Sequence, residues 1–217
     1  MALRAVIACA FLALAVAGCG GGKSASTTTT GSSAKPAPQL ATGGPPWPAP
    51  KNAVELTKRA GLVPERAEFL QYHVHAHLDI FVNGDPVRVT SGIGINIADP
   101  AVKREQLEDG TFAYGGIDPP CKKPCISPLH THDDSGVIHT ESKTPTPNRL
   151  GQLFVEWNVK LTPTCVGGYC KPVPIALYVD GKPFIGDPGL IELSDQKEIA
   201  IVIGTHPDSI PDKFPAG

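Results

Sequence analysis

The chain has 217 residues, of which 18% are charged, and its formal net charge of -2 gives it no strong basic field. This charge balance argues against nucleic acid as the main partner. Glycine and proline occur 23 times each, which indicates many turns and short strands rather than long helices.

The N-terminus combines a short positive region with an apolar run. Arg4 precedes uncharged residues 5–17, a length typical of a signal-peptide core and short for a membrane span. The run ends in Val16-Ala17-Gly18-Cys19, which resembles the lipobox of bacterial lipoproteins, so residues 1–18 are predicted to be a lipoprotein signal peptide. The resemblance implies diacylation of Cys19, and therefore an exported protein anchored to a cell membrane by lipid. The alternative is an ordinary cleaved signal peptide followed by an unmodified cysteine.

Residues 19–50 are predicted to hold the lipidated cysteine and a flexible linker. The stretch consists mainly of Gly, Ser, Thr, Ala and Pro, and its only charges are Lys23 and Lys35. Such a composition buries too little apolar surface to offset the loss of chain entropy on folding. We therefore expect a disordered tether that holds the folded domain, residues 51–217, away from a membrane.

The segment from Tyr72 to Val82 carries the clearest pattern in the domain. Its even positions are apolar, and its odd positions are His73, His75, His77, Asp79 and Phe81. This period of two predicts a strand with one buried face. The Asn83-Gly84 pair that follows is typical of a tight hairpin turn into a second strand over residues 86–90.

The remaining elements are expected to be short. The pattern predicts a helix over 53–60 with a capping box at its start, and a helix within 148–159. Alternation around Ile93–Ile97 predicts that the strand over 86–90 continues there or that another strand follows it. A strand over 137–141, a hairpin over 175–185 and a last strand around 199–203 are also predicted. Residues 98–128 are rich in proline and are expected to be loop-rich. The sum predicts a single α+β domain with two helices and a mainly antiparallel sheet of short strands.

Six of the seven histidines fall into two groups, which are His73, His75 and His77, and then His130, His132 and His139. Side chains at i and i+2 of a strand point the same way, so two neighbouring imidazoles can bind one metal ion. Alternation along the predicted strand over 137–141 also places Val137, His139 and Glu141 on one face of that strand. The sequence therefore predicts a transition-metal site in which three or four imidazoles bind one ion and the others bind a second ion or support the ligands. The alternatives are surface histidines or a pH sensor of stacked imidazoles.

Four carboxylates lie close to these histidines in the sequence, namely Asp79, Asp133, Asp134 and Glu141. Each could orient an imidazole through its second nitrogen, complete the coordination, or act as a base on a metal-bound water. Asp133 and Asp134 could instead simply form the turn before Gly136. Glu141 is the better candidate for a base. His206 is isolated and is expected at the surface.

Imidazole ligands suit Zn, Cu, Fe and Ni. Met1 is the only methionine, so soft thioether ligands for Cu(I) are missing and Zn(II) and Cu(II) are the leading metals. The cysteines that follow Cys19 are Cys121, Cys125, Cys165 and Cys170. In an oxidising compartment they should form disulfides, and we favour the local pairs 121–125 and 165–170 over a cross-pairing or a four-cysteine zinc site.

The segments HVHAHLDIFVNG, PLHTHDDSGVIHTES, LGQLFVEWNV and DGKPF resemble a family of uncharacterised exported bacterial and archaeal proteins. The resemblance covers roughly residues 70–204 and implies that the six histidines act as one site, but it implies no activity. A cupin is a poor fit, because the glutamate that should closely follow the H-x-H pair comes too late.

Metal sequestration, buffering or transfer at the cell surface is the leading functional hypothesis, with a metal ion and the membrane as partners. The second hypothesis is a metal-dependent hydrolase or hydratase with Glu141, Asp133 or Asp134 as its base. The chain contains no H-E-x-x-H motif, which weighs against this enzyme. The third hypothesis is a purely structural metal in an adhesion or scaffold domain.

Overall fold

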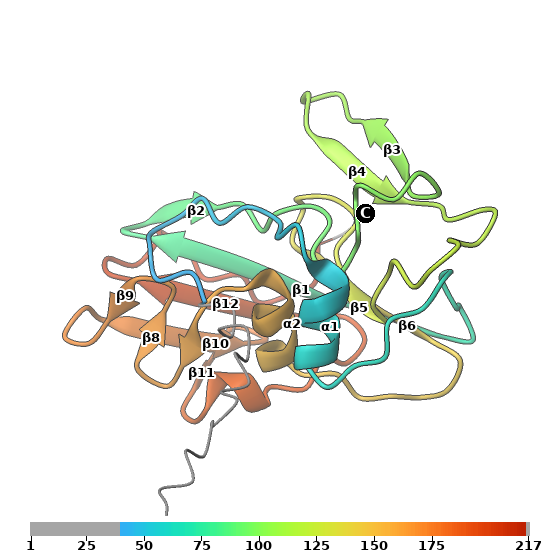
Figure 1. Ribbon diagram of the computed structural model, residues 1–217. Helices are drawn as coiled ribbons and strands as arrows, with labels where there is room; N and C mark the ends of the chain where they lie inside the picture. The colour runs from blue at the N-terminus through green and yellow to red at the C-terminus, as the bar shows by residue number, and fades with distance from the viewer. Residues whose placement is uncertain (1–39, 216–217) are drawn as a thin grey trace, which may run out of the picture. The chain divides into compact units, whose positions relative to one another are not determined.

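Strand β1 (Tyr72–Val82) crosses the middle of a seven-stranded sheet in the computed structural model, which describes residues 40–215 (Figure 1). The sheet has the order β11-β10-β12-β1-β6-β5, and β2 pairs with the C-terminal end of β1. The β1–β12 pairing is parallel, and the other pairings among residues 40–215 that define this sheet are antiparallel. The predicted α+β domain with a mainly antiparallel sheet is thus confirmed.

The other strands of this sheet are β2 (Asp85–Val87), β5 (Leu129–His130), β6 (Val137–Ser142), β10 (Ile175–Val179), β11 (Lys182–Phe184) and β12 (Lys197–Ile203). Two small antiparallel sheets lie outside it, β3 (Lys103–Gln106) with β4 (Phe112–Gly115), and β7 (Leu161–Thr162) with β8 (Cys165–Val166) and β9 (Tyr169–Cys170). The helices are α1 (Ala53–Arg59), α2 (Leu150–Trp157) and the 3-10 turn η1 (Pro188–Leu190).

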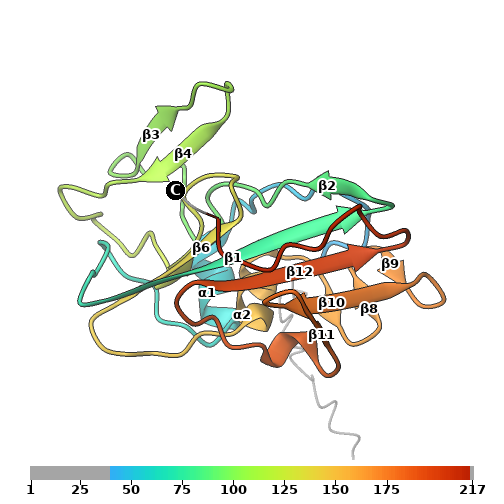
Figure 2. The same ribbon diagram turned by 180° about the vertical axis from the view of Figure 1, so that it is seen from behind.

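Helices α1 and α2 cover one face of the large sheet, as Figures 1 and 2 show from opposite sides. The even positions of β1 that are fully buried, among them Leu78 and Ile80, join Leu153 and Trp157 of α2 in one hydrophobic core. Burying each such side chain contributes about 1.5–3 kcal/mol to folding. The odd positions of β1 therefore point to the opposite face, where the histidines lie.

The packed domain begins before Lys51, the residue at which the sequence analysis predicted its start. The Trp157 indole donates a hydrogen bond to the carbonyl of Trp47, and the two indole rings meet edge to face at 5.6 Å. Trp47 is buried in the core, and Ala41 pairs with Val159. Residues 40–50 therefore belong to the domain, because the buried Trp47 side chain packs this Gly- and Pro-rich stretch against α2.

Two local expectations were wrong. The segment around Ile93–Ile97 is a turn rather than a strand, because Gly92 and Gly94 adopt φ values of +79° and +74°, which interrupt extended backbone. Residues 98–128 are loop-rich, as expected, and also contain the β3–β4 hairpin, which the sequence did not predict. All four residues of β3 are exposed, so this strand lacks the alternation by which sequence patterns reveal strands. The predicted capping box of α1 is also missing, because the Asn52 side chain caps no backbone amide.

The local disulfides are confirmed. Cys121 bonds to Cys125 with an S–S distance of 2.04 Å, and Cys165 bonds to Cys170 with an S–S distance of 2.10 Å. Their sulfurs are thus not available for the alternative four-cysteine zinc site. Buried Cys121 and Cys125 form a small second core with Ile95 and Ile126, directly before β5.

Candidate metal centre

The strand register gathers histidines from three neighbouring strands into one row. His75 of β1 lies directly opposite His139 of β6, and His139 lies directly opposite His130 of β5. Side chains of directly opposite residues project from the same face of a sheet. The register therefore brings together imidazoles that are 64 and nine positions apart in the chain, on the face opposite the helices.

The imidazole rings of this row, with the neighbouring rings of His73 and His132, are close enough to share a metal ion. The Nε2 atom of His75 lies 3.1 Å from Nδ1 of His139, and the Nε2 atoms of His130 and His132 lie 3.3 Å apart. The ring centroids of His73 and His75 are 4.5 Å apart. Two nitrogens bound to one ion at about 2.0–2.1 Å in a tetrahedral site are about 3.3–3.4 Å apart, so these separations suit coordination.

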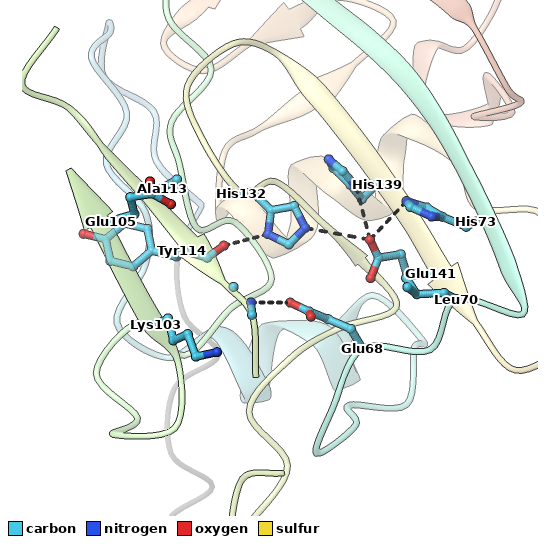
Figure 3. Close-up of a pocket in the computed structure, with 12 residues that line it drawn as sticks. Glu68, Leu70, His73, Lys103, Glu105, Ala113, Tyr114, His132, His139 and Glu141 are labelled. Atoms are coloured by element: carbon cyan, nitrogen blue, oxygen red, sulfur yellow. Dashed lines mark hydrogen bonds and ion pairs between the residues drawn. The ribbon is translucent and has the colours of Figure 1, made fainter. Parts of the chain in front are cut away.

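The Glu141 carboxylate points toward His73, His132 and His139 (Figure 3). Its Oε1 atom lies 3.3 Å from Nε2 of His73, 3.2 Å from Nδ1 of His139 and 3.7 Å from Nε2 of His132. Its Oε2 atom lies 3.8 Å from Nε2 of His130. Only 4% of the Glu141 side chain is exposed, so its negative charge is held among imidazoles rather than in solvent. Glu141 thus lies in direct contact with the histidines and is itself a possible ligand.

We call these six residues the histidine cluster; they are His73, His75, His130, His132, His139 and Glu141. Their ligand atoms form two overlapping groups, and within each group all of them lie within 4.8 Å of one another. One group contains His130, His132, His139 and Glu141, and the other contains His73, His75 and His139. His139 belongs to both groups, so the two possible ion positions adjoin each other.

Backbone carbonyls fix the tautomers of two rings. Nδ1 of His130 donates to the carbonyl of Ser127 at 2.9 Å, and Nδ1 of His132 donates to the carbonyl of Tyr114 at 2.6 Å. In the neutral rings both Nε2 atoms then carry lone pairs, and these atoms face each other at 3.3 Å. Two facing lone pairs repel, and a cation between them removes the repulsion. Carbonyls that orient ligating histidines in this way are typical of metal sites.

The environment keeps His130 and His75 neutral, which is the form that binds metal, whereas contacts with Glu141 and the Tyr114 carbonyl outweigh burial and raise the pKa of His132. Burial, with a further contribution from the nearby His132, lowers the pKa of His130 to about 3. Burial and the neighbouring His139 and His73 also lower the pKa of His75. Burial alone would raise the pKa of Glu141, but its contacts with His132 and His139 outweigh burial and lower it, so the carboxylate is ionised.

His77 lies outside the histidine cluster, so the structure places five rather than six of the predicted histidines together. Its Nδ1 atom lies 2.8 Å from Oε2 of Glu198, and its Nε2 atom donates to the carbonyl of Ser135 at 2.9 Å. The physical reason is strand pairing: the residues opposite His77 are Val137 on β6 and Glu198 on β12, and neither is a histidine.

The predicted carboxylates take different positions. Asp133 accepts hydrogen bonds from the amide and hydroxyl of Ser135, at 3.0 and 2.5 Å, and so forms the turn. Asp134 pairs with Arg88 at 2.5 Å, away from the imidazoles. Asp79 lies 3.6 Å from His77. Of the four, Glu141 is the one that belongs to the histidine cluster.

The remaining histidine is exposed, as expected. His206 contacts the Tyr178 hydroxyl at 3.4 Å.

The histidine cluster opens onto a cavity of about 440 Å³, whose wall includes His73, His132, His139 and Glu141. The opposite wall is the β3–β4 hairpin, which the amide of Tyr114 joins to the carbonyl of His132 at 3.0 Å. Gly115 allows this approach, because a Cβ atom there would lie 2.6 Å from Nδ1 of His132. The sequence analysis did not predict the β3–β4 hairpin or the position of Glu198 beside His77. The sequence signal for Glu198 is a charged residue directly before the alternating isoleucines of β12.

No family model, curated protein or solved structure matches the chain. The resemblance to the exported bacterial and archaeal family stays a prediction, and the chemistry of the histidine cluster itself must indicate the function.

Proposed function

We propose that this protein is an exported, lipid-anchored protein that binds a transition-metal ion, Zn(II) or Cu(II), at the histidine cluster in order to sequester or transfer it. The observation that carries the proposal is the facing pair of Nε2 atoms on His130 and His132, 3.3 Å apart, with both Nδ1 atoms donating to carbonyls. Imidazole nitrogens with one carboxylate suit both metals.

The gradient of exposure along the histidine cluster supports transfer. The side chain of His73 is 34% exposed, that of His139 is 17% exposed, and that of His130 is 1% exposed. Because His139 belongs to both ligand groups, an ion bound at the exposed group can pass to the buried group by exchanging ligands around one shared imidazole. The same steps in reverse would release it to an acceptor.

Attachment to a membrane through Cys19 rests on the sequence, because residues 1–18 and Cys19 lie outside the described residues. No helix within residues 40–215 is both long and apolar enough to cross a bilayer. Two disulfides suit the oxidising environment outside the cytoplasm. The disulfides thus support export, whereas attachment by lipid rests on the resemblance of residues 16–19 to a lipobox.

The cavity favours a second candidate function, a hydrolase or hydratase that uses a metal-activated water. Four residues of the histidine cluster line this cavity, so a metal there would face a space for substrate. The Oε2 atom of Glu141 is buried and has no hydrogen-bond partner, which suits a ligand or a base. A bound metal would supply the activated water, and Glu141 would accept its proton.

Elemental analysis of the full chain, purified in detergent without chelator, tests metal binding. We expect bound Zn or Cu in the wild type and in the exposed control His206→Ala, and loss of metal in His75→Ala or His132→Ala with the fold retained by circular dichroism. Full metal content in both of these variants would contradict the assignment.

Spectroscopy of the Co(II)-substituted chain separates the two functions. A closed four-coordinate spectrum supports sequestration, and a spectrum that shifts when small anions bind supports the enzyme.

A further inference from the structure

A second group of possible metal ligands lies next to the histidine cluster on the same face of β1. Nδ1 of His77 is 2.8 Å from Oε2 of Glu198 and 3.6 Å from Oδ2 of Asp79. Each of the three residues offers a ligand atom within 4.8 Å of the other two. We call them the His77 group. None of them belongs to the histidine cluster, so a ligand here would be bound independently.

The His77 group contains two carboxylates and only one side chain that can carry a positive charge. Among the ion pairs that join residues 40–215, those of Asp79 and Glu198 are with His77, and neither has a lysine or arginine partner. A protonated His77 balances one carboxylate and leaves the second. Glu198 is the buried carboxylate and Asp79 is partly exposed, so a cation bound between them would stabilise both negative charges.

An unpartnered atom points to the same conclusion independently. Glu198 is 1% exposed, and its Oε1 atom is buried without a hydrogen-bond partner. The nearby Asp79 carboxylate can hydrogen-bond to Glu198 only if the two carboxylates share a proton. Burial raises the pKa of Glu198 against the opposing effect of His77, and the charge of Asp79 and a hydrogen bond with it raise the pKa further, so the anion is costly unless a cation or a shared proton neutralises it.

The imidazole orientation also suits a metal. Nε2 of His77 donates to the carbonyl of Ser135, so Nδ1 is the ring nitrogen that faces both carboxylates and would bind a cation in place of a proton. The Asp79 side chain is 30% exposed and leaves an opening to solvent. The ring of Phe214 lies 6.1 Å from that of His77, where the C-terminal segment passes over β1 (Figure 2). The His77 group is thus partly covered but accessible.

We propose that His77, Asp79 and Glu198 form a second divalent-cation site, separate from the histidine cluster, that takes a cation preferring mixed nitrogen and carboxylate ligands. One imidazole with two carboxylates is a harder ligand set than the histidine cluster, and carboxylates suit Mn(II). The two sites thus differ in the metals that they should hold.

Titration of the full chain with Mn(II), with free Mn(II) followed by its electron paramagnetic resonance signal, tests the proposal. We expect one saturable site per chain. Asp79→Asn and Glu198→Gln, which keep the shape and remove the charge, should each weaken it by about tenfold or more. Asp85→Asn removes an exposed carboxylate from neighbouring β2 and is the matched control, with unchanged Mn(II) binding expected.

The double variant His132→Ala/His139→Ala separates this site from the proposed function. It should lose Zn or Cu from the histidine cluster and keep the Mn(II) site, whereas Asp79→Asn should keep the Zn or Cu. Circular dichroism checks that each variant is folded. Wild-type Mn(II) binding in both Asp79→Asn and Glu198→Gln would overturn the proposal and show that protons balance the carboxylates. Loss of the Mn(II) site in the double variant would equally overturn it, because Mn(II) would then depend on the histidine cluster.

Discussion

His75 and His139 lie directly opposite each other on β1 and β6, with Nε2 of His75 3.1 Å from Nδ1 of His139. On the other side of His139, β5 places His130 in the same row. One imidazole therefore joins the exposed and buried groups of possible ligands. Any exchange of a metal ion between these groups depends on His139.

We therefore expect His139→Ala to be the most damaging single substitution in the histidine cluster. Loss of a residue that merely orients a ligand costs about 10–100-fold in metal affinity, so loss of a ligand shared by both groups should cost more than about 100-fold. Exposed His73→Ala removes a ligand from one group only and should cost less. Competition with a chromogenic chelator measures both affinities; equal losses would contradict the shared role of His139.

Gly115→Ala should weaken metal binding without removing a ligand. Its Cβ atom would lie 2.6 Å from Nδ1 of His132, so the ring must move and lose its hydrogen bond to the Tyr114 carbonyl. We expect a fall in metal affinity of about 10–100-fold, as for other losses of ligand-orienting contacts. Gly110→Ala is the control, because it also has a positive φ but no atom within 4 Å of its Cβ. Isothermal calorimetry compares the two; equal affinities would contradict this role of Gly115.

Glu156 should make the domain less stable as the pH rises. Burial raises the pKa of this α2 carboxyl to about 8, against the smaller opposing effect of the Ser127 and Thr57 hydroxyls. Between its unfolded value near 4.5 and its folded value near 8, the folded state holds a proton that the unfolded state releases. The contribution of the protonated Glu156 carboxyl to the free energy of unfolding is fully present below pH 4.5. It declines as the pH rises to 8, by roughly 3–5 kcal/mol in total.

Urea unfolding of the chelator-treated chain between pH 5 and 9 measures this decline. Glu156→Gln keeps the shape and cannot ionise, so the difference in unfolding free energy between wild type and variant should grow in favour of the variant as the pH rises. The exposed Glu55→Gln in α1 is the control and should follow the wild type. The histidines are the same in all three proteins, so their effect cancels in the comparison. Parallel pH profiles for wild type and Glu156→Gln would refute the prediction.

The Cys121–Cys125 disulfide should contribute to stability more than to metal binding. It closes a short loop before β5, within a small core that includes Ile95 and Ile126. Chain-entropy arguments give about 2 kcal/mol for a loop of this length. The double variant Cys121→Ser/Cys125→Ser should unfold at lower urea concentration and still bind metal when folded. Loss of metal from the folded variant would show instead that the disulfide positions His130.

The local pattern of the sequence determined which residues form β1 and α2 and which side of β1 carries the histidines. Residues 72–82 alternate with a period of two, and this period places the apolar set against α2 and His73, His75 and His77 on the other face. The spacing of the cysteines likewise favoured the local disulfides that the structure contains. These features depend on residues close together in the chain, so pattern and spacing suffice to predict them.

Only the tertiary structure decided which histidines meet. His77 projects from the same face as His75, yet β12 places Glu198 beside it, 121 positions away. The exposed β3–β4 hairpin gave no periodic signal, although it forms a wall of the cavity. Alternation along one strand sets only the direction of a side chain. Its neighbours depend on strand order and register, which arise from backbone hydrogen bonds and core packing between distant segments.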